Sequence, residues 1–285
     1  MRFLVLGCNG MAGHMISIYL QEQGHDVIGF ARRESKIVKT ITGDVTDFGS
    51  LTDIIKNGKF DSIINCIGIL NQFAEKDHAG AVLINGYLPH FLAKATIDMD
   101  TQIIQMSTDC VYSGKTGGYT EKSLPDGVTF YDRTKAIGEL NDGKNVTLRN
   151  SIVGPDINKN GIGLLNWFMQ QNGTVQGFTG ALWTGQTTLQ LAKTMEVAAK
   201  NRVFGLYNMV PDSNISKYDL LKLFNKYIRK KKLEIVPKDG FVADKTLIRT
   251  NFNDFSYQIP DYETMVKELG DWMRKHKSLY PQYDL

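Results

Sequence analysis

The chain has little cysteine, little net charge and no long hydrophobic run. Its three cysteines, Cys8, Cys66 and Cys110, are an odd number without metal-ligand spacing, which argues against a disulfide framework and predicts a reduced, cytoplasmic protein. The 33 Lys and Arg residues outweigh the 30 Asp and Glu residues by only +3, too little to predict nucleic acid or a membrane surface as a partner. The five histidines are scattered, so no metal site is expected.

No apolar stretch approaches the length of a transmembrane helix. The segment Met1 to Cys8 superficially resembles a bacterial lipoprotein signal, because an aliphatic residue, a glycine and a cysteine follow a positive charge. Its apolar part is far shorter than the about seven to fifteen residues that a signal sequence requires. We therefore expect neither export nor membrane anchoring.

The sequence does contain a regular alternation of short apolar runs and helical patterns through residue 150. This alternation is typical of a parallel sheet that helices cover on both faces. It predicts the α/β class, with a Rossmann-type doubly wound parallel sheet. The expected strands lie near 2–6, 26–30, 62–66, 102–107 and 145–150, and the expected helices near 10–22, 48–57, 79–97 and 130–141, with C-terminal stops at Gly24 and Gly58.

The second half of the chain contains segments of two kinds. A helical pattern over 183–200 and an apolar run from Gly205 to Val210 predict a helix and a sixth strand that return to the sheet. The other segments are richer in Asn, aromatic residues and irregular spacing, which indicates a smaller, discontinuous substrate-binding lobe. The expected organisation is an NAD(P)-binding domain of residues 1–150, joined by 183–210, and a lobe of residues 151–182 and 211–285.

Three glycines follow the first apolar run at the spacing Gly-x-x-Gly-x-x-Gly. Gly7 permits a tight turn, Gly10 lets the backbone approach a pyrophosphate, and Gly13 lets the helix pack closely on the strand. A plain strand–turn–helix connection is the alternative. The position of the turn at residue 7 of an alternating strand–helix chain favours nucleotide binding.

The end of the second expected strand indicates which dinucleotide binds. An acidic side chain there would accept a hydrogen bond from an adenosine 2′-hydroxyl, but Arg32 and Arg33 follow the strand instead. Two guanidinium groups suit a 2′-phosphate, so the sequence favours NADP over NAD. Glu34 keeps NAD open, two exposed surface arginines are a further alternative, and Asp26 is at the wrong end of the strand.

Tyr131 and Lys135 are four residues apart and project from the same face of an expected helix. An ammonium group beside a phenol lowers the phenol pKa from about 10 and makes it a better acid at neutral pH. An earlier strand ends in the hydroxyls of Ser107 and Thr108, at the edge where open parallel sheets bind ligands. These two side chains point to opposite sides, so only one of them can face a nicotinamide.

Together these motifs resemble the extended short-chain dehydrogenase/reductase superfamily, and within it the dTDP-4-dehydrorhamnose reductase family. The resemblance is close over about residues 1–155 and looser beyond them. The motifs that carry it are Gly7/Gly10/Gly13, Asp44-Val45-Thr46-Asp47, Asn65-Cys66-Ile67-Gly68, Ser107-Thr108-Asp109, Val111-Tyr112-Ser113-Gly114, Tyr119-Thr120-Glu121, Pro125, Tyr131, Lys135, Gly138-Glu139, Leu148-Arg149-Asn150-Ser151 and Trp183-Thr184-Gly185.

The resemblance implies hydride transfer from NADPH to the keto carbon of a nucleotide-linked deoxysugar, in surface polysaccharide biosynthesis. It implies that Tyr131 protonates the carbonyl oxygen, that Thr108 orients this oxygen and that Lys135 holds the nicotinamide ribose. The expected cofactor-binding residues are Gly7, Asn9, Gly10, Met11, Gly13, Arg32, Arg33, Asp44, Val45, Cys66, Ile67, Gly68, Met106, Tyr131 and Lys135. The expected substrate-binding residues are Thr108, Asp109, Asn150 and Trp183.

Two positions depart from the pattern of the family. Asp132 stands where the family usually has glycine, and it adds a charge next to the acid. Cys110 stands where related 4,6-dehydratases tend to have a glutamate, whose carboxylate takes a proton during elimination. A thiol cannot fill that role, so a dehydratase is disfavoured, and we interpret Cys110 as a small buried hydrophobic residue.

Two other functions stay open. A sugar-nucleotide 4-epimerase is excluded by no residue, and a non-catalytic NAD(P)-binding sensor or scaffold would use the same fold without need of a proton donor. Some members of the resembling family dimerise through a magnesium ion held by acidic side chains near the C-terminus. Residues 276–285 contain no such cluster, so we expect no metal, a nucleotide sugar as the partner, and a monomer or homodimer.

Overall fold

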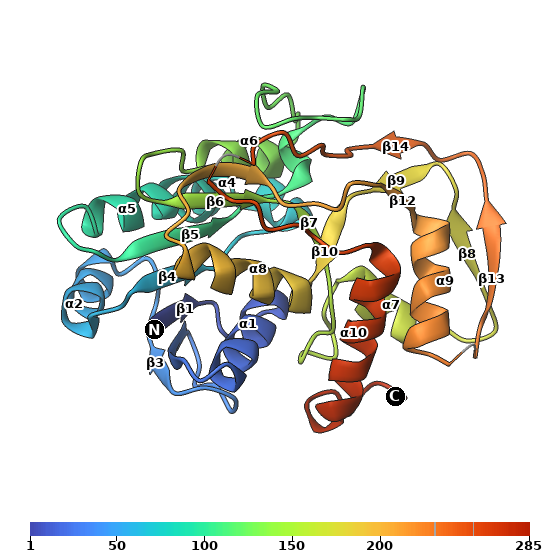
Figure 1. The fold of residues 1–285 in the computed structure, drawn as a ribbon, viewed down its shortest axis with the longest axis horizontal. Helices are drawn as coiled ribbons and strands as arrows, with labels where there is room; N and C mark the ends of the chain where they lie inside the picture. The colour runs from blue at the N-terminus through green and yellow to red at the C-terminus, as the bar shows by residue number, and fades with distance from the viewer. Residues whose placement is uncertain (231, 253) are drawn as a thin grey trace.

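The computed structural model describes residues 1–230, 232–252 and 254–285. Within these residues the largest sheet has seven parallel strands in the order β11-β6-β5-β4-β1-β2-β3, with helices on both faces (Figure 1). This arrangement confirms the expected doubly wound α/β class. The strands are β1 (Arg2–Leu6), β2 (Asp26–Ala31), β3 (Thr40–Thr42), β4 (Ser62–Asn65), β5 (Gln102–Met106), β6 (Val146–Arg149) and β11 (Gly205–Asn208).

The central strand β1 is buried on both faces, which explains its unbroken apolar sequence. The helices of this part are α1 (Met11–Glu22), α2 (Phe48–Gly58), α3 (Asn71–Lys76), α4 (His78–Ala81), α5 (Leu88–Ala95), α6 (Phe130–Ile137) and α8 (Thr188–Lys200). Phe3 and Val5 pack in one cluster with α1 and α8, whereas Leu4 and Leu6 pack in another with α2 and α5. Each of these fully buried side chains contributes about 1.5–3 kcal/mol to folding. Because successive side chains of β1 point to opposite faces, this burial stabilises the helices on both faces of the sheet.

The strand order reverses between β1 and β4. The chain builds β1, β2 and β3 toward one edge, and then β4, β5, β6 and β11 toward the other. Leu6 is in register with both Phe30 and Asn65, so the carboxyl ends of these three strands lie level. Open sheets bind ligands in the crevice at such a reversal, which locates the candidate site at this edge.

In the same described ranges, the remaining strands form three small sheets. Their elements are β7 (Ser151–Val153), α7 (Leu164–Met169), β8 (Thr174–Phe178), β9 (Ala181–Trp183), β10 (Gly185–Thr187), β12 (Ile215–Ser216), α9 (Lys217–Tyr227), β13 (Glu234–Lys238), β14 (Ala243–Asp244) and α10 (Tyr262–Lys275). The pairs β8–β13 and β9–β14 bring segments that are distant in sequence side by side (Figure 1). One hydrophobic cluster continues from α1 and α8 into α9 and α10. The assignment of these segments to a substrate-binding lobe stays a prediction.

The helix expected over 183–200 begins only at Thr188, so the prediction of a helix over residues 183–187 was wrong. Residues 181–187 form β9 and β10, and the Thr187 hydroxyl caps α8 by accepting a hydrogen bond from the Gln190 N–H at 3.1 Å. The expected sixth strand is β11. The edge strand β3 was not expected, because its three residues are too few to give an alternating pattern.

The helix expected over 79–97 is interrupted by a π-helix over Val82–Tyr87. Such a wider turn is rare and is frequent at functional sites. Here it holds the Asn85 side chain against the loop after β4. The Asn85 Oδ1 atom accepts from the Ile69 N–H at 2.8 Å, and the Asn85 Nδ2 atom donates to the Ile69 carbonyl at 2.9 Å.

Three glycines lie at or just after the C-terminal ends of helices, and each is required there for its own reason. Gly24 follows α1 with φ +79°, the left-handed conformation that glycine favours, as the expected stop requires. Gly58 is the last residue of α2, and the left-handed residue is Lys59 instead; a Cβ at Gly58 would lie 2.0 Å from the Phe60 ring. The helix expected over 130–141 ends before Gly138, where a Cβ would lie 1.9 Å from a carbonyl oxygen of the π-helix. Gly58 and Gly138 are therefore required by packing.

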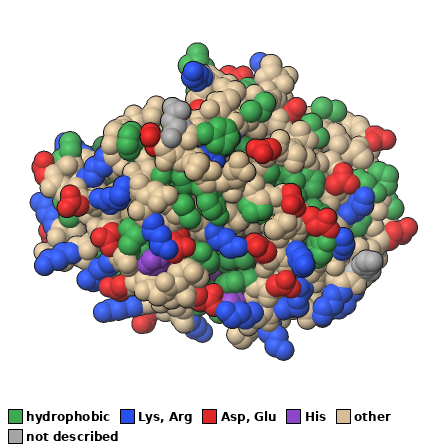
Figure 2. Space-filling view, in the orientation of Figure 1, with side chains coloured by type: hydrophobic (Ala, Val, Ile, Leu, Met, Phe, Trp, Pro, Cys, Tyr) green, Lys and Arg blue, Asp and Glu red, His purple; other side chains and the backbone are tan. Residues whose placement is uncertain are grey.

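Charged side chains of both signs are interspersed over the face in Figure 2. Among the helices in the described ranges, none combines the length and the apolar composition that crossing a membrane requires.

Candidate active site

The glycine-rich turn joins β1 to α1 in the geometry that a dinucleotide needs. Gly7 has φ +80°, and the Gly10 N–H donates to the Gly7 carbonyl at 2.9 Å. A Cβ at Gly13 would lie 2.1 Å from that same carbonyl oxygen, so only glycine lets α1 start so close to the strand. A Cβ at Gly10 would meet only the Gly7 oxygen, at 3.3 Å. The space beyond Gly10 is thus open to a pyrophosphate at the helix N-terminus.

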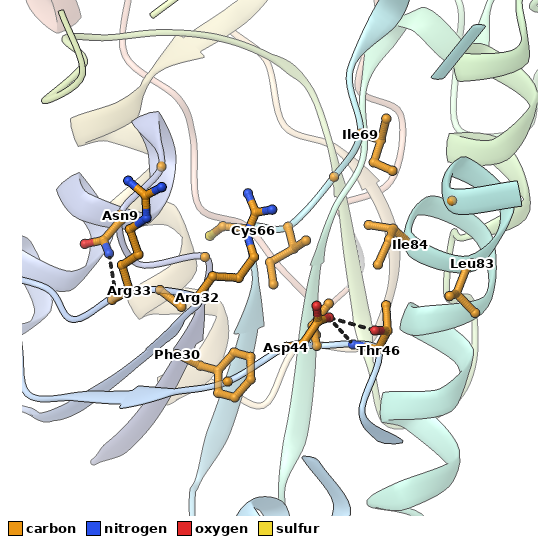
Figure 3. A pocket seen from close by; sticks show the side chains of 18 of the residues that line it. Asn9, Phe30, Arg32, Arg33, Asp44, Thr46, Cys66, Ile69, Leu83 and Ile84 are labelled. Carbon is orange, nitrogen blue, oxygen red and sulfur yellow. Dashed lines mark hydrogen bonds between the residues drawn. The ribbon is translucent and has the colours of Figure 1, made fainter. Parts of the chain in front are cut away.

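A cavity of about 890 Å³ extends from this turn along the carboxyl ends of β1, β2 and β4 (Figure 3). This volume is in the range of cofactor sites. The residues expected to bind cofactor that line it are Gly7, Asn9, Gly10, Arg32, Arg33, Asp44, Val45, Cys66, Ile67 and Gly68. Met11, Gly13, Met106, Tyr131 and Lys135 are not among its lining residues, and their roles stay predictions.

Two arginines occupy the end of β2, where a side chain would meet the adenosine ribose. Figure 3 shows Arg32 and Arg33 extending into the space between Asn9 and Asp44. The Asn9 Nδ2 atom donates to the Arg33 carbonyl at 3.0 Å and ties this segment to the glycine-rich turn. Hydrogen bonds from Thr46 lower the pKa of Asp44, with a smaller contribution from Arg32. Two exposed guanidinium groups therefore border the cavity, as a 2′-phosphate would require.

Several lining residues were not expected. Thr46 donates its N–H and its hydroxyl to Asp44 at 2.9 and 2.7 Å, and it belongs to a motif that already pointed to this turn. Leu83 and Ile84 come from the π-helix, which no sequence pattern indicated. Asn158 comes from a loop after β7.

The expected proton donor and lysine lie one turn apart on α6. Thr129 caps this helix, and the Asp132 carboxylate accepts a hydrogen bond from the Thr129 N–H at 3.2 Å in a capping box. The charge that sets this chain apart from the family pattern therefore also stabilises the start of the helix. The Lys135 Nζ atom donates to the Met106 carbonyl at the end of β5, at 2.7 Å.

The electrostatics of Tyr131 differ from the sequence-based expectation. Burial raises the pKa of Tyr131, the neighbouring Cys110 adds to this shift, and a hydrogen bond with Thr108 opposes it. Lys135 is not among the causes, since its ammonium points to the Met106 carbonyl. The Tyr131 pKa is therefore shifted in the direction opposite to the one expected from its spacing to Lys135. Burial also lowers the pKa of Lys135 to about 8.

The two hydroxyls after β5 point to different partners. Thr108 donates to the Asp109 carboxylate at 3.1 Å and lies beside Tyr131, whereas Ser107 donates to Glu139 at 2.5 Å. Glu139 forms a buried ion pair with Arg149 at 2.6 Å. Thr108 is thus on the tyrosine side, in agreement with the expected alternation, and Ser107 belongs to a buried polar network that the sequence did not indicate.

The expected substrate contacts surround the Thr108 turn. Burial raises the pKa of Asp109, and the charge of Lys217 on α9 is the largest opposing cause. Trp183 is buried, and the Lys217 ammonium lies 5.0 Å from the centre of its ring. Lys217 therefore covers one face of the Trp183 ring, which we expected to contact substrate. Asn150 is buried at the end of β6, and the contacts of Asn150 and Trp183 with substrate stay predictions.

Burial disfavours the thiolate form of the two cysteines near the site. Burial raises the pKa of Cys66 and that of Cys110 to about 12 each, so both stay protonated at neutral pH. Over the described ranges, no group of three or more His, Cys, Asp and Glu side chains could hold a metal ion.

Comparisons with known proteins identify relatives of this chain. A probable low-salt glycan biosynthesis reductase of Haloferax volcanii is 32% identical over 139 residues, which cover 47% of this chain and 46% of that protein. A dTDP-4-dehydrorhamnose reductase of Aggregatibacter actinomycetemcomitans is 25% identical over 251 residues, with 83% and 82% covered. The chain spans about half the length of most curated relatives that it matches.

The fold is also similar to solved structures. The structure of a dTDP-4-dehydrorhamnose reductase from Bacillus anthracis, in complex with NADP, superposes with a TM-score of 0.78 at 19% identity, and it covers 94% of this chain and 98% of that one. A family model described as the RmlD substrate binding domain matches residues 1–246. Because this match takes in well over half of the residues, the chain belongs to the RmlD substrate binding domain family, as its motifs predicted.

Proposed function

We propose that this chain is an NADPH-dependent reductase of the 4-keto group of a nucleotide-linked deoxysugar. The observation that carries the proposal is the meeting of Thr108, Tyr131 and Lys135 at the carboxyl end of β5. This group lies beside the cavity: Lys135 contacts the Met106 carbonyl, and the residue before Met106, Gln105, is in register with Asn65, which directly precedes the cavity-lining Cys66. The names of the relatives support the same reaction, since several are dTDP-4-dehydrorhamnose reductases.

Each residue of the trio has a separate task in this reaction. Tyr131 gives its phenolic proton to the carbonyl oxygen of the sugar; its raised pKa keeps that proton in place at neutral pH. Thr108 orients the same oxygen through its hydroxyl. The Lys135 ammonium has three N–H bonds; within the described ranges one donates to the Met106 carbonyl, and the other two can donate to the ribose hydroxyls. NADPH, when bound, supplies the hydride that reduces the carbonyl carbon.

The cofactor preference rests on Arg32 and Arg33. Replacing both by alanine should weaken NADPH binding by about tenfold or more, because charge-assisted hydrogen bonds to the 2′-phosphate are lost. NADH has no such phosphate, and its affinity should change by less than about twofold on the same argument. Titration of both cofactors measures the effect, with Lys36→Ala as the control, since Lys36 is exposed but does not line the cavity. Equal losses for NADPH and NADH would contradict the arginine assignment.

Among the residues assigned to the lobe, Lys217 is the best candidate for a contact with the substrate. Its ammonium lies over the Trp183 ring, burial lowers its pKa to about 8, and the charge of Asp109 opposes this shift. An anionic group of the substrate diphosphate would be a second charged partner for this ammonium, besides Asp109. Lys217→Met should raise KM for the sugar nucleotide by about tenfold, the value of one charge-assisted hydrogen bond, and leave NADPH affinity unchanged. Lys222→Met is the control on the same helix, and a raised KM in both variants would argue against the contact.

One assay tests the proposed reaction. The protein is incubated with NADPH and a panel of 4-keto sugar nucleotides, and NADPH consumption and product are measured together. A reductase consumes one NADPH for each reduced sugar. Inversion at carbon 4 of a 4-hydroxy sugar nucleotide, added as a second substrate without net change in the cofactor, would favour a 4-epimerase. Binding of NADPH without any product from either kind of substrate would favour a sensor or scaffold.

The proposed setting is cytoplasmic synthesis of surface polysaccharide precursors. The three cysteines are free, which agrees with a reducing compartment. A monomer or a homodimer is compatible with the site, because Thr108, Tyr131 and Lys135 all come from one chain.

A further inference from the structure

His14, in the first turn of α1, links the glycine-rich turn to the segment after α10. The ring is fully buried, with its Nδ1 atom 3.0 Å from the Gly10 carbonyl oxygen and its Nε2 atom 2.8 Å from the Tyr280 hydroxyl. A carbonyl only accepts, so Nδ1 carries the proton and Nε2 accepts from the tyrosine. Burial lowers the pKa of His14 to about 4, and the ring therefore stays neutral in this tautomer.

The Gly10 carbonyl is thereby fixed in orientation. It accepts from the His14 N–H at 2.9 Å as well as from the ring, so two donors hold it toward the body of the helix. The peptide bond is planar, so the Met11 N–H on the other side of this unit points away from the helix, toward the open space beyond Gly10. That N–H belongs to the helix N-terminus at which a pyrophosphate would bind.

The same segment is also linked to the loop that contains the cavity-lining residue Asn158. The Tyr283 hydroxyl accepts from the Asp156 N–H at 3.0 Å and donates to Asn166 at 2.7 Å. The Gln282 side chain donates to the Asp156 carbonyl at 2.6 Å. Asp156 in turn accepts from the N–H of Asn158, which lines the cavity.

We propose that residues 280–283 act as a clasp that positions the pyrophosphate subsite, with Tyr280 acting on Gly10 through His14 and Tyr283 acting on the Asn158 loop. Tyr280 and Tyr283 are positioning residues: both are buried, and their rings stack with centroids 5.7 Å apart. α10, which precedes them, lies between α1 and α9 and so connects the glycine-rich turn to the rest of the chain (Figure 1). The proposal rests on the proposed dinucleotide cofactor.

The test compares two ligands in the full chain. 2′-Phosphoadenosine reaches the adenosine side of the cavity only, and 2′-phospho-ADP-ribose adds the pyrophosphate. Tyr280→Phe removes one hydroxyl and leaves the ring packing. It should weaken 2′-phospho-ADP-ribose by about fivefold, the value of one lost hydrogen bond, and leave 2′-phosphoadenosine within about twofold. Calorimetric titration measures both dissociation constants.

Tyr262→Phe is the matched control, because it also removes the hydroxyl of a buried tyrosine that donates a hydrogen bond, in this case to the Ser213 carbonyl at 2.8 Å. It should change neither affinity. Tyr283→Phe is the second variant and should also weaken 2′-phospho-ADP-ribose selectively. Equal losses for both ligands in Tyr280→Phe, or no loss at all, would overturn the clasp while leaving the proposed reaction intact. A wild-type protein that binds neither ligand would overturn the cofactor and the clasp together.

Discussion

Tyr131→Phe should lower turnover by about 10²–10⁴, the usual contribution of a positioned general acid. The substitution removes one hydroxyl and keeps the ring, which is buried on α6. NADPH should still bind, with a loss of no more than about fivefold, because the variant removes at most one hydrogen bond between the Tyr131 hydroxyl and the cofactor. Steady-state kinetics on a confirmed substrate and a separate NADPH titration measure the two quantities.

The control for this variant is Tyr87→Phe. Tyr87 belongs to the π-helix, is 49% exposed and has no task in the proposed reaction. It should keep wild-type turnover and wild-type affinity. If Tyr131→Phe also kept wild-type turnover, the catalytic assignment would be wrong and a binding protein without catalysis would be favoured.

Lys135→Ala should damage both turnover and cofactor affinity. The ammonium donates to the Met106 carbonyl and is assigned to the nicotinamide ribose, so its loss removes charge-assisted hydrogen bonds worth about tenfold or more in NADPH affinity. Lys94→Ala, on the exposed side of α5, should change neither quantity. A Lys135→Ala variant that lost turnover but bound NADPH normally would contradict the assignment to the ribose.

The same lysine gives NADPH binding a pH dependence. Burial lowers the pKa of Lys135 to about 8, and the charge of Glu139 opposes this shift. Below this pH the ammonium is present, so NADPH affinity should be constant with respect to this group. Above it the free protein loses the proton that binding requires, and affinity should fall toward about tenfold per pH unit. The slope should be absent in Lys135→Ala, and a wild-type affinity constant to about pH 10 would contradict the account.

The features predictable from the sequence depend on local spacing. Gly7, Gly10 and Gly13 follow a strand at fixed intervals, and the strand, the turn and α1 were therefore predicted together. The different directions of the Thr108 and Ser107 side chains were predicted from the alternation of side chains along a strand. This alternation does not depend on distant residues. The family was predicted from the same short motifs and is confirmed by the match over residues 1–246.

The features that were missed depend on residues far apart in the chain. His14 and Tyr280 are 266 positions apart, and their hydrogen bond leaves no pattern near either residue. The shift in the Tyr131 pKa depends on burial by the folded chain, whereas the spacing to Lys135 predicted the opposite direction. Lys217 is the first residue of α9 and directly follows β12. It acts on Asp109 because the short strand β12 pairs with β9, which is distant in sequence. Local periodicity carries no information on such contacts.

Transfer of a deuterium label tests the central claim most directly. The protein is mixed with a 4-keto deoxysugar nucleotide and NADPH that carries deuterium at its transferable position, and the product is analysed by mass spectrometry and NMR. The account predicts one deuterium at carbon 4 of the sugar, with one NADPH oxidised for each product molecule, and only a trace of product with Tyr131→Phe in the same time. Product without the label, or a label at another carbon, would contradict direct reduction of the 4-keto group.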